Sequence, residues 1–231
     1  MGVKLDQEGV MRLLDKLSEQ ALSCCAVPPE SYELCVYVRE NPYLRKNPDI
    51  DTAAKKFINY QIAKCTTSGF LAGLGGIITL PVTIPANVSS VLYVQMRMIA
   101  GLAYMGGYDT DSDQVQTLVY ACLAGISVDQ VLKQAGIKFG NKFAMAMVKK
   151  IPGEVLAKIN QRVGFRFITK FGTKGIINLG KAVPAVGGVI GGGFDFIETK
   201  AIANRAYGLF VKGDLTASSD GTDDIKIVKE V

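Results

Sequence analysis

The chain has 231 residues, of which 48% are hydrophobic, and a formal net charge of +5. It contains no histidine, which excludes Ser-His-Asp and Cys-His catalysis and removes the commonest metal ligand. The five cysteines form no CxxC pair, so we expect free thiols in a reducing cytoplasm, and neither a metal nor another cofactor. We expect one helical domain over residues 1–212 and a polar, flexible tail over residues 213–231.

Apolar residues recur with helical spacing along most of the chain, which predicts an all-α fold with about eight helices in one compact bundle. Asp51 or Thr52 can cap the third helix and Asp111 or Ser112 the fifth, while Gly125–Ser127 separates two helices. The expected helices cover residues 6–25, 30–38, 53–80, 85–105, 114–124, 128–150, 154–171 and 184–211.

Two apolar, glycine-rich stretches, residues 69–107 and 182–194, organise this prediction. We expect them to form helices that pack against each other in the core, because small residues three or four positions apart let helix backbones approach closely. The glycines placed for this role are Gly69, Gly73, Gly76, Gly187, Gly188, Gly191 and Gly192.

The same stretches raise the question of a membrane span, which needs about 20 apolar residues. Residues 69–80 and 182–194 are too short, and residues 86–104 are long enough but contain Gln95 and Arg97. An arginine at the bilayer centre costs at least about 2.5 kcal/mol. Buried core helices are therefore favoured over a membrane-inserting hairpin or an integral membrane protein.

Four polar residues in these stretches are candidates for a buried contact or for a ligand site: Gln95, Arg97, Asp195 and Glu198. If the two helices pack together, Arg97 can form a structural ion pair with one of the acids. Alternatively, the four side chains line an apolar cavity for a lipid or another small molecule. An enzyme that uses Asp195 and Glu198 alone is the least favoured interpretation.

Positive charge is concentrated between residues 130 and 181, where eleven Lys and Arg residues accompany one acid, Glu154, so that the window carries +10. Such a face is either simply solvated or binds anions, and an anionic membrane surface or a membrane protein complex is the most natural partner. Nucleic acid is disfavoured, because no recognition motif is present. The candidate binding residues are Lys138, Lys142, Lys149, Lys158, Arg162, Arg166, Lys170 and Lys174.

Two segments resemble the EcsC family: LPVTIPANVSSVLYVQMRMIAGLAYMGGYD (residues 80–109) and VPAVGGVIGGGFDFIETKAIANRAYGLF (residues 183–210). The resemblance extends over about two-thirds of the chain, although Asp195 stands where EcsC-like sequences tend to have Asn. The family takes its name from a bacterial protein encoded beside an ABC transporter. The resemblance therefore implies an association with membrane or transport systems. Together with the missing histidine and the basic window, it leads us to expect a non-enzymatic, cytoplasmic protein that is peripheral at the inner membrane or associated with a transport complex.

Overall fold

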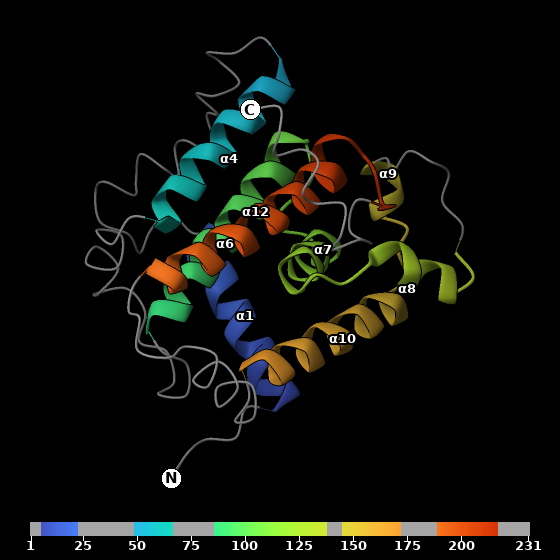
Figure 1. Ribbon diagram of the computed structural model, residues 1–231. Helices are drawn as coiled ribbons and strands as arrows, with labels where there is room; N and C mark the ends of the chain where they lie inside the picture. The colour runs from blue at the N-terminus through green and yellow to red at the C-terminus, as the bar shows by residue number, and fades with distance from the viewer. Residues whose placement is uncertain (1–5, 23–48, 67–85, 138–144, 172–188, 217–231) are drawn as a thin grey trace.

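The computed structural model describes residues 6–22, 49–66, 86–137, 145–171 and 189–216, and within these residues the chain is helical and contains no strand (Figure 1). This architecture confirms the predicted all-α bundle. The elements are α1 (Gln7–Leu22), α4 (Ile50–Thr66), α6 (Ala86–Met105), α7 (Asp113–Ala124), α8 (Val128–Gln134), α9 (Met145–Val148), α10 (Gly153–Phe171), α12 (Val189–Ala206) and the π-helical segment η1 (Tyr207–Val211).

Helix α6 lies at the centre of the bundle and packs against α1, α4, α7, α12 and η1. Every residue from Leu92 to Ala103 is buried, as expected of a helix that is apolar on all sides. Figure 1 shows α4, α6 and α12 side by side, with α4 running in the opposite direction to the other two. The predicted packing of the two apolar stretches is thus confirmed for the parts that form α6 and α12.

Close packing around α6 depends on glycines that the sequence patterns did not single out. A Cβ atom on Gly101 would lie 2.6 Å from the ring of Phe57 on α4, and one on Gly106 would lie 2.1 Å from the carbonyl oxygen of Phe210. Gly191 and Gly192 lie within α12, and the other predicted packing glycines lie outside the described residues: Gly69, Gly73, Gly76, Gly187 and Gly188.

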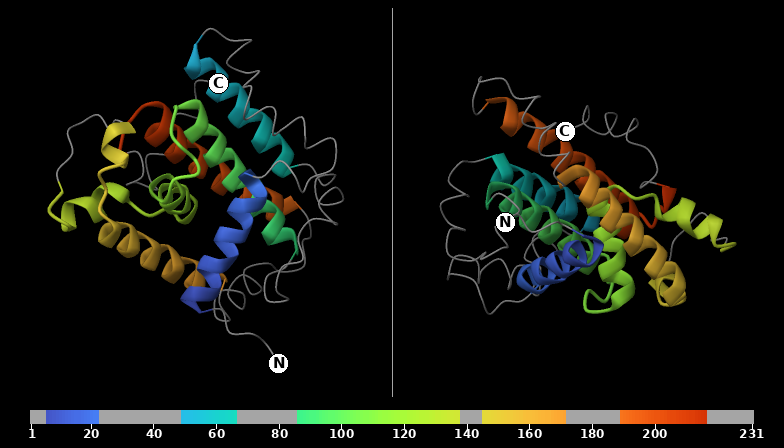
Figure 2. Two further views of the ribbon diagram at one scale, coloured as in Figure 1. Left: turned by 180° about the vertical axis from the view of Figure 1, so that it is seen from behind. Right: turned by 90° about the horizontal axis from the view of Figure 1, so that it is seen from below.

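Two amphipathic helices, α1 and α10, close the lower side of the bundle in Figure 1 and contact each other, while α7 is seen end-on between α10 and the central helices. Figure 2 shows the same arrangement from behind and from below. Both helices bury an apolar stripe and expose the opposite face, as their spacing predicts. The buried residues are Val10, Leu13, Leu14 and Leu17 on α1, and Val155, Leu156, Ile159, Val163 and Phe167 on α10.

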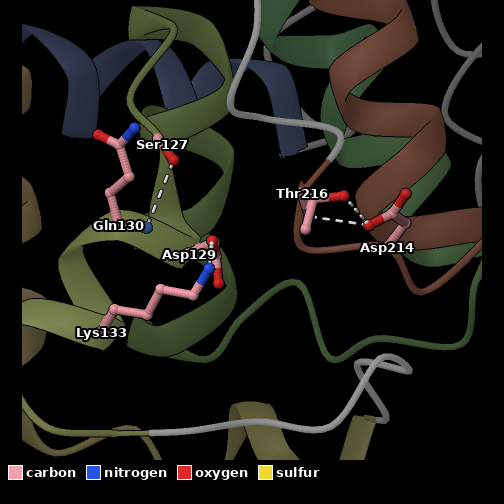
Figure 3. A network of polar contacts seen from close by, with 6 residues as sticks. All are labelled: Ser127, Asp129, Gln130, Lys133, Asp214 and Thr216. Atoms are coloured by element: carbon pink, nitrogen blue, oxygen red, sulfur yellow. Dashed lines mark hydrogen bonds and ion pairs between the residues drawn. The ribbon is translucent and has the colours of Figure 1, made fainter.

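The predicted single helix over residues 128–150 is wrong. Helix α8 begins after Ser127, whose side chain accepts a hydrogen bond from the backbone N–H of Gln130 (Figure 3), and ends at Gln134. Gly136 then adopts a φ of 74°, a left-handed conformation that suits glycine and stops the helix. The next described helix is α9, and residues 138–144 lie outside the described part.

One predicted helix cap differs from the structure, and the other is in place without a capping hydrogen bond from its side chain. The carboxylate of Asp49, rather than Asp51 or Thr52, accepts hydrogen bonds from the backbone N–H and the hydroxyl of Thr52, and α4 starts one residue after Asp49. Ser112 stands at the N-cap position of α7, but its hydroxyl donates to the carbonyl of Asp109. A single turn often holds several capping residues, and tertiary contacts select among them.

The core continues past residue 212. The backbone N–H of Asp214 donates to the carbonyl of Gly208 over 2.8 Å, and Leu215 is buried. The carboxylate of Asp214 accepts from both the N–H and the hydroxyl of Thr216 (Figure 3). Residues 213–216 of the predicted tail therefore pack onto the bundle, and residues 217–231 lie outside the described part.

Candidate anion-binding site

Three of the predicted basic residues lie on one exposed side of α10. Lys158, Arg162 and Arg166 recur every four residues on the exposed side of the helix, opposite its buried apolar stripe. Lys149, just after α9, is also exposed. Arg162 donates from Nη2 to Oε1 of Gln134 on α8, so its guanidinium is oriented along the surface.

The side chains of the other four predicted basic residues lie outside what the structure describes. Lys170 lies in α10, but its side chain is outside what the structure describes. Lys138, Lys142 and Lys174 fall in segments that are not described, so their part in a continuous basic face stays a prediction.

Helix α7 ends beside the exposed side of α10 in a glycine C-cap. Gly125 has a φ of 65°, its N–H donates to the carbonyl of Cys122, and the N–H of Ile126 donates to the carbonyl of Ala121. This is the Schellman arrangement, in which a left-handed glycine ends the helix and satisfies its last carbonyl groups. The bare Cα of Gly125 leaves space at the surface next to α7.

Two arginines from different helices converge on that space. A Cβ atom placed on Gly125 would lie 3.3 Å from Nη1 of Arg205 on α12 and 3.7 Å from Nη2 of Arg166 on α10. The partial negative charge at the end of α7 favours cations at this position. The geometry therefore places two guanidinium groups around one point, at the C-terminus of a helix.

A pocket of about 340 Å³ opens at this point, between α6, α7, α10 and α12. Among the described residues of the lining, Arg166, Arg205 and Glu198 are charged and together carry +1. The apolar part of the lining is formed by Leu92, Leu123, Ala124, Phe167, Ile197 and Ala201. We call this the Arg166–Arg205 pocket.

A second, more open pocket of about 560 Å³ lies between α10, the start of α1 and the turn after α7. Arg166 lines both pockets, and Arg162 is the second cation of the open one. Gln7, Ile126, Gln161, Phe165 and Thr169 complete its lining. The described part of this lining contains two cations and no acid.

Large apolar side chains are exposed next to Arg166. Ile197, at 68%, and Phe165, at 63%, are the two most exposed large hydrophobic residues of the described chain. Ile197 lines the Arg166–Arg205 pocket and Phe165 lines the open one. Single exposed hydrophobic residues are common on protein surfaces, but here two of them flank the same cation.

The predicted buried polar group is divided between the core and the surface. Gln95 and Arg97 are each 2% exposed and line neither pocket. Gln95 bonds to Thr199, and Arg97 donates from Nη1 to the hydroxyl of Tyr93 over 2.9 Å. Glu198 instead lies half-buried beside Arg166 and Arg205. Asp195 belongs to α12, but its side chain is not described, so its predicted pairing with Arg97 stays untested.

Metal ligands and the thiol of Cys122 were the other candidates for chemistry among the described residues. No group of three or more His, Cys, Asp and Glu side chains among them could hold a metal ion. Cys122 is fully buried, and burial raises the pKa of its thiol to about 12, so the reactive thiolate is suppressed.

Comparison with known proteins places the chain in a family. Residues 46–212 match the EcsC protein family, which is more than half of the sequence. The chain belongs to the EcsC family. No curated protein and no solved structure matches it.

The EcsC match includes α4 to η1 and therefore both pockets except for Gln7. Within the described residues of this EcsC protein, no single helix is long and apolar enough to cross a bilayer. Helices α7 and α8 meet the length and composition test only together, as a pair bent by 118°.

Sequence reasoning missed Arg205, Phe165 and Ile197 in this EcsC chain. A usable signal was present on α12, because Ile197, Ala201 and Arg205 are spaced by four residues and share one helix face. On α10, Phe165 directly precedes Arg166 within the basic row. Their proximity across helices required the fold.

Proposed function

We propose that this EcsC protein is a non-enzymatic protein that docks on the cytoplasmic surface of the inner membrane, or on a transport complex in it, through the exposed basic face of α10. The observation that carries the proposal is the separation of faces on α10: Lys158, Arg162 and Arg166 are exposed in one row while Ile159, Val163 and Phe167 are buried. Membership of the EcsC family adds support, since the family's name derives from a protein encoded beside a transporter.

The expected strength of docking is modest and salt-sensitive. Each Lys or Arg near an anionic leaflet contributes about 1 kcal/mol. Three exposed cations therefore contribute about 3 kcal/mol, or about two powers of ten in affinity. Salt screens exposed charges, so raising the ionic strength weakens binding. Phe165 adds apolar contact with the interface, which salt does not screen.

Vesicle flotation tests the proposal directly. The protein should float with vesicles that contain phosphatidylglycerol, and not with pure phosphatidylcholine vesicles. The double variant R162E/R166E should lose this binding. The matched control is K55E/K56E, which makes the same change in net charge at two exposed positions on α4. Circular dichroism shows whether each variant keeps the helical content of the parent protein.

Two results would overturn membrane docking: flotation that ignores lipid charge, and flotation that R162E/R166E leaves unchanged. Equal losses in R162E/R166E and in K55E/K56E would also count against it, because they would indicate a response to net charge and no role for the α10 face.

A further inference from the structure

We infer that the Arg166–Arg205 pocket binds the phosphodiester headgroup of a monoanionic phospholipid, while Ile197 and Phe165 enter the apolar edge of the bilayer. This inference rests on the proposed docking function and assigns the site that recognises the lipid. It follows from the position of the two guanidinium groups, the charge and size of the pocket, and the exposed apolar residues beside it.

The arginine geometry favours an anion. Nη1 of Arg205 and Nη2 of Arg166 both lie within 4 Å of one point beside Gly125, so like charges from two helices face each other. The C-terminus of α7 and Glu198 offset part of the repulsion. A phosphate between the two groups accepts hydrogen bonds from both of them, and guanidinium groups suit phosphate oxygens because they offer several donors in one plane.

The charge of the lining selects the type of phosphate. The described lining, with two arginines and Glu198, carries +1, which a phosphodiester with one negative charge neutralises. A phosphomonoester with nearly two charges would bring excess negative charge next to the carboxylate of Glu198. The pocket therefore matches a glycerophospholipid diester better than a terminal phosphate.

The size of the pocket indicates that it holds the headgroup alone. Pockets for small ligands range from about 300 to 1,000 Å³, and 340 Å³ is at the lower end of that range. The acyl chains would remain in the bilayer. Ile197 and Phe165 are placed to meet them, since each lines one of the two pockets that Arg166 separates.

A titration with soluble lipid separates headgroup binding from general attraction to a charged surface. The probe is dihexanoyl phosphatidylglycerol, kept below the concentration at which it forms micelles and followed by isothermal calorimetry or NMR. Dihexanoyl phosphatidylcholine and inorganic phosphate are the comparison ligands. We expect saturable one-to-one binding of the phosphatidylglycerol monomer and weaker binding of the other two.

Two pairs of variants test the lining. R166Q should weaken binding by at least about tenfold, because it removes a charged hydrogen-bond donor, whereas R12Q removes the same charge from an exposed residue of α1 and should have no effect. E198Q should tighten binding several-fold, whereas E154Q, an exposed acid at the start of α10, should not. A gain of affinity in E198Q cannot come from misfolding.

The apolar part of the inference is tested on vesicles. I197Q and F165Q should each reduce flotation on phosphatidylglycerol vesicles several-fold without changing the affinity for the soluble monomer by more than about twofold. M145Q, at an exposed residue of α9 that lines neither pocket, is the control and should float like the parent protein.

Each outcome bears on one of the two proposals. If R162E/R166E abolishes flotation but the soluble phosphatidylglycerol does not saturate the protein, the headgroup pocket is wrong and docking stands. If inorganic phosphate binds as tightly as the lipid monomer, the pocket is a free-phosphate site and the lipid assignment is wrong. If flotation survives R162E/R166E, docking through α10 is itself wrong.

Discussion

Gln95 donates a hydrogen bond from Nε2 to the hydroxyl oxygen of Thr199 over 2.9 Å, and this bond joins α6 to α12 in the core of the bundle. Both residues are buried, so neither can exchange its partner for water. A buried polar group that loses its partner costs about 1–3 kcal/mol. The bond thus makes the packing of the two apolar stretches specific as well as favourable.

Replacing both partners of this bond should therefore cost less than the sum of the two single replacements. We expect Q95M or T199V alone to lower the free energy of unfolding by about 1–3 kcal/mol, and the double variant to lose less than the two single losses combined. Urea denaturation followed by circular dichroism measures these values. Q130M, at an exposed glutamine, is the control, and additive losses in the double variant would contradict the coupling.

Gly106, directly after α6, should tolerate substitution less than Gly101 within that helix. A Cβ atom there would lie 2.1 Å from the carbonyl oxygen of Phe210, a backbone atom that cannot rotate away. We expect G106A to cost at least about 1–3 kcal/mol and G101A, which meets the ring of Phe57, to cost less. Thermal melts compare both with G153A, where a Cβ atom meets nothing within 4 Å and stability should be unchanged or slightly raised.

The sequence predicted the elements of this fold where the periodicity of apolar residues is strong. Helix α10 is the clearest case, since the spacing of Ile159, Val163 and Phe167 alone determines which side of it carries Arg162 and Arg166. Prediction from the sequence failed where a single residue decides whether a helix continues or ends. Gly136 fits inside a helix pattern at a small cost, and its left-handed conformation became evident only in the structure.

Of the two arginines at the candidate site, the sequence predicted Arg166 and missed Arg205. Arg166 belongs to a periodic row that the sequence displays. Arg205 lies 39 positions away along the chain, and its approach to Gly125 depends on how α12 crosses the end of α7. Local spacing contains no information about that crossing. Glu198 was predicted as a buried polar or ligand contact, and in the structure it lines the pocket together with Arg166 and Arg205.

The contact between α4 and η1 should lose stability at high pH. Lys212 forms an ion pair with Asp51 at 2.6 Å, and its hydrogen bond to Asp51 raises its pKa. Burial, followed by a hydrogen bond to Asp51, raises the pKa of Tyr207 to about 12. Both groups have folded pKa values above their unfolded values, near 10.4 for lysine and 10 for tyrosine. Their contribution is therefore complete below about pH 10 and is lost as the pH rises through the folded pKa values.

The variant Y207F isolates the tyrosine part of this effect. It removes the late titration, so its stability relative to the parent protein should increase between about pH 10 and pH 12 and stay constant from about pH 7 to pH 9. Denaturation at a series of pH values, together with the ultraviolet absorbance of tyrosinate, measures both quantities. A stability difference that does not vary across this alkaline range would contradict the raised pKa.

Helix α1 should stabilise the same core as the family-matched region, although it lies before residue 46, where the EcsC match begins. It packs against α6 and α10, and the hydroxyl of Tyr120 on α7 donates to the carboxylate of Asp15 over 3.0 Å. Leu14 is fully buried in this interface. We expect L14A to lower the free energy of unfolding by about 2–5 kcal/mol, through lost burial and the cavity that remains. E19A, on the exposed side of α1, should change it by less than about 0.5 kcal/mol.

The unfolding transition of L14A distinguishes two cases. A single transition that shifts equally by circular dichroism and by tyrosine fluorescence would show that α1 and the EcsC region unfold as one unit. If L14A unfolded α1 alone and left the main transition unchanged, α1 would not be part of the cooperative core.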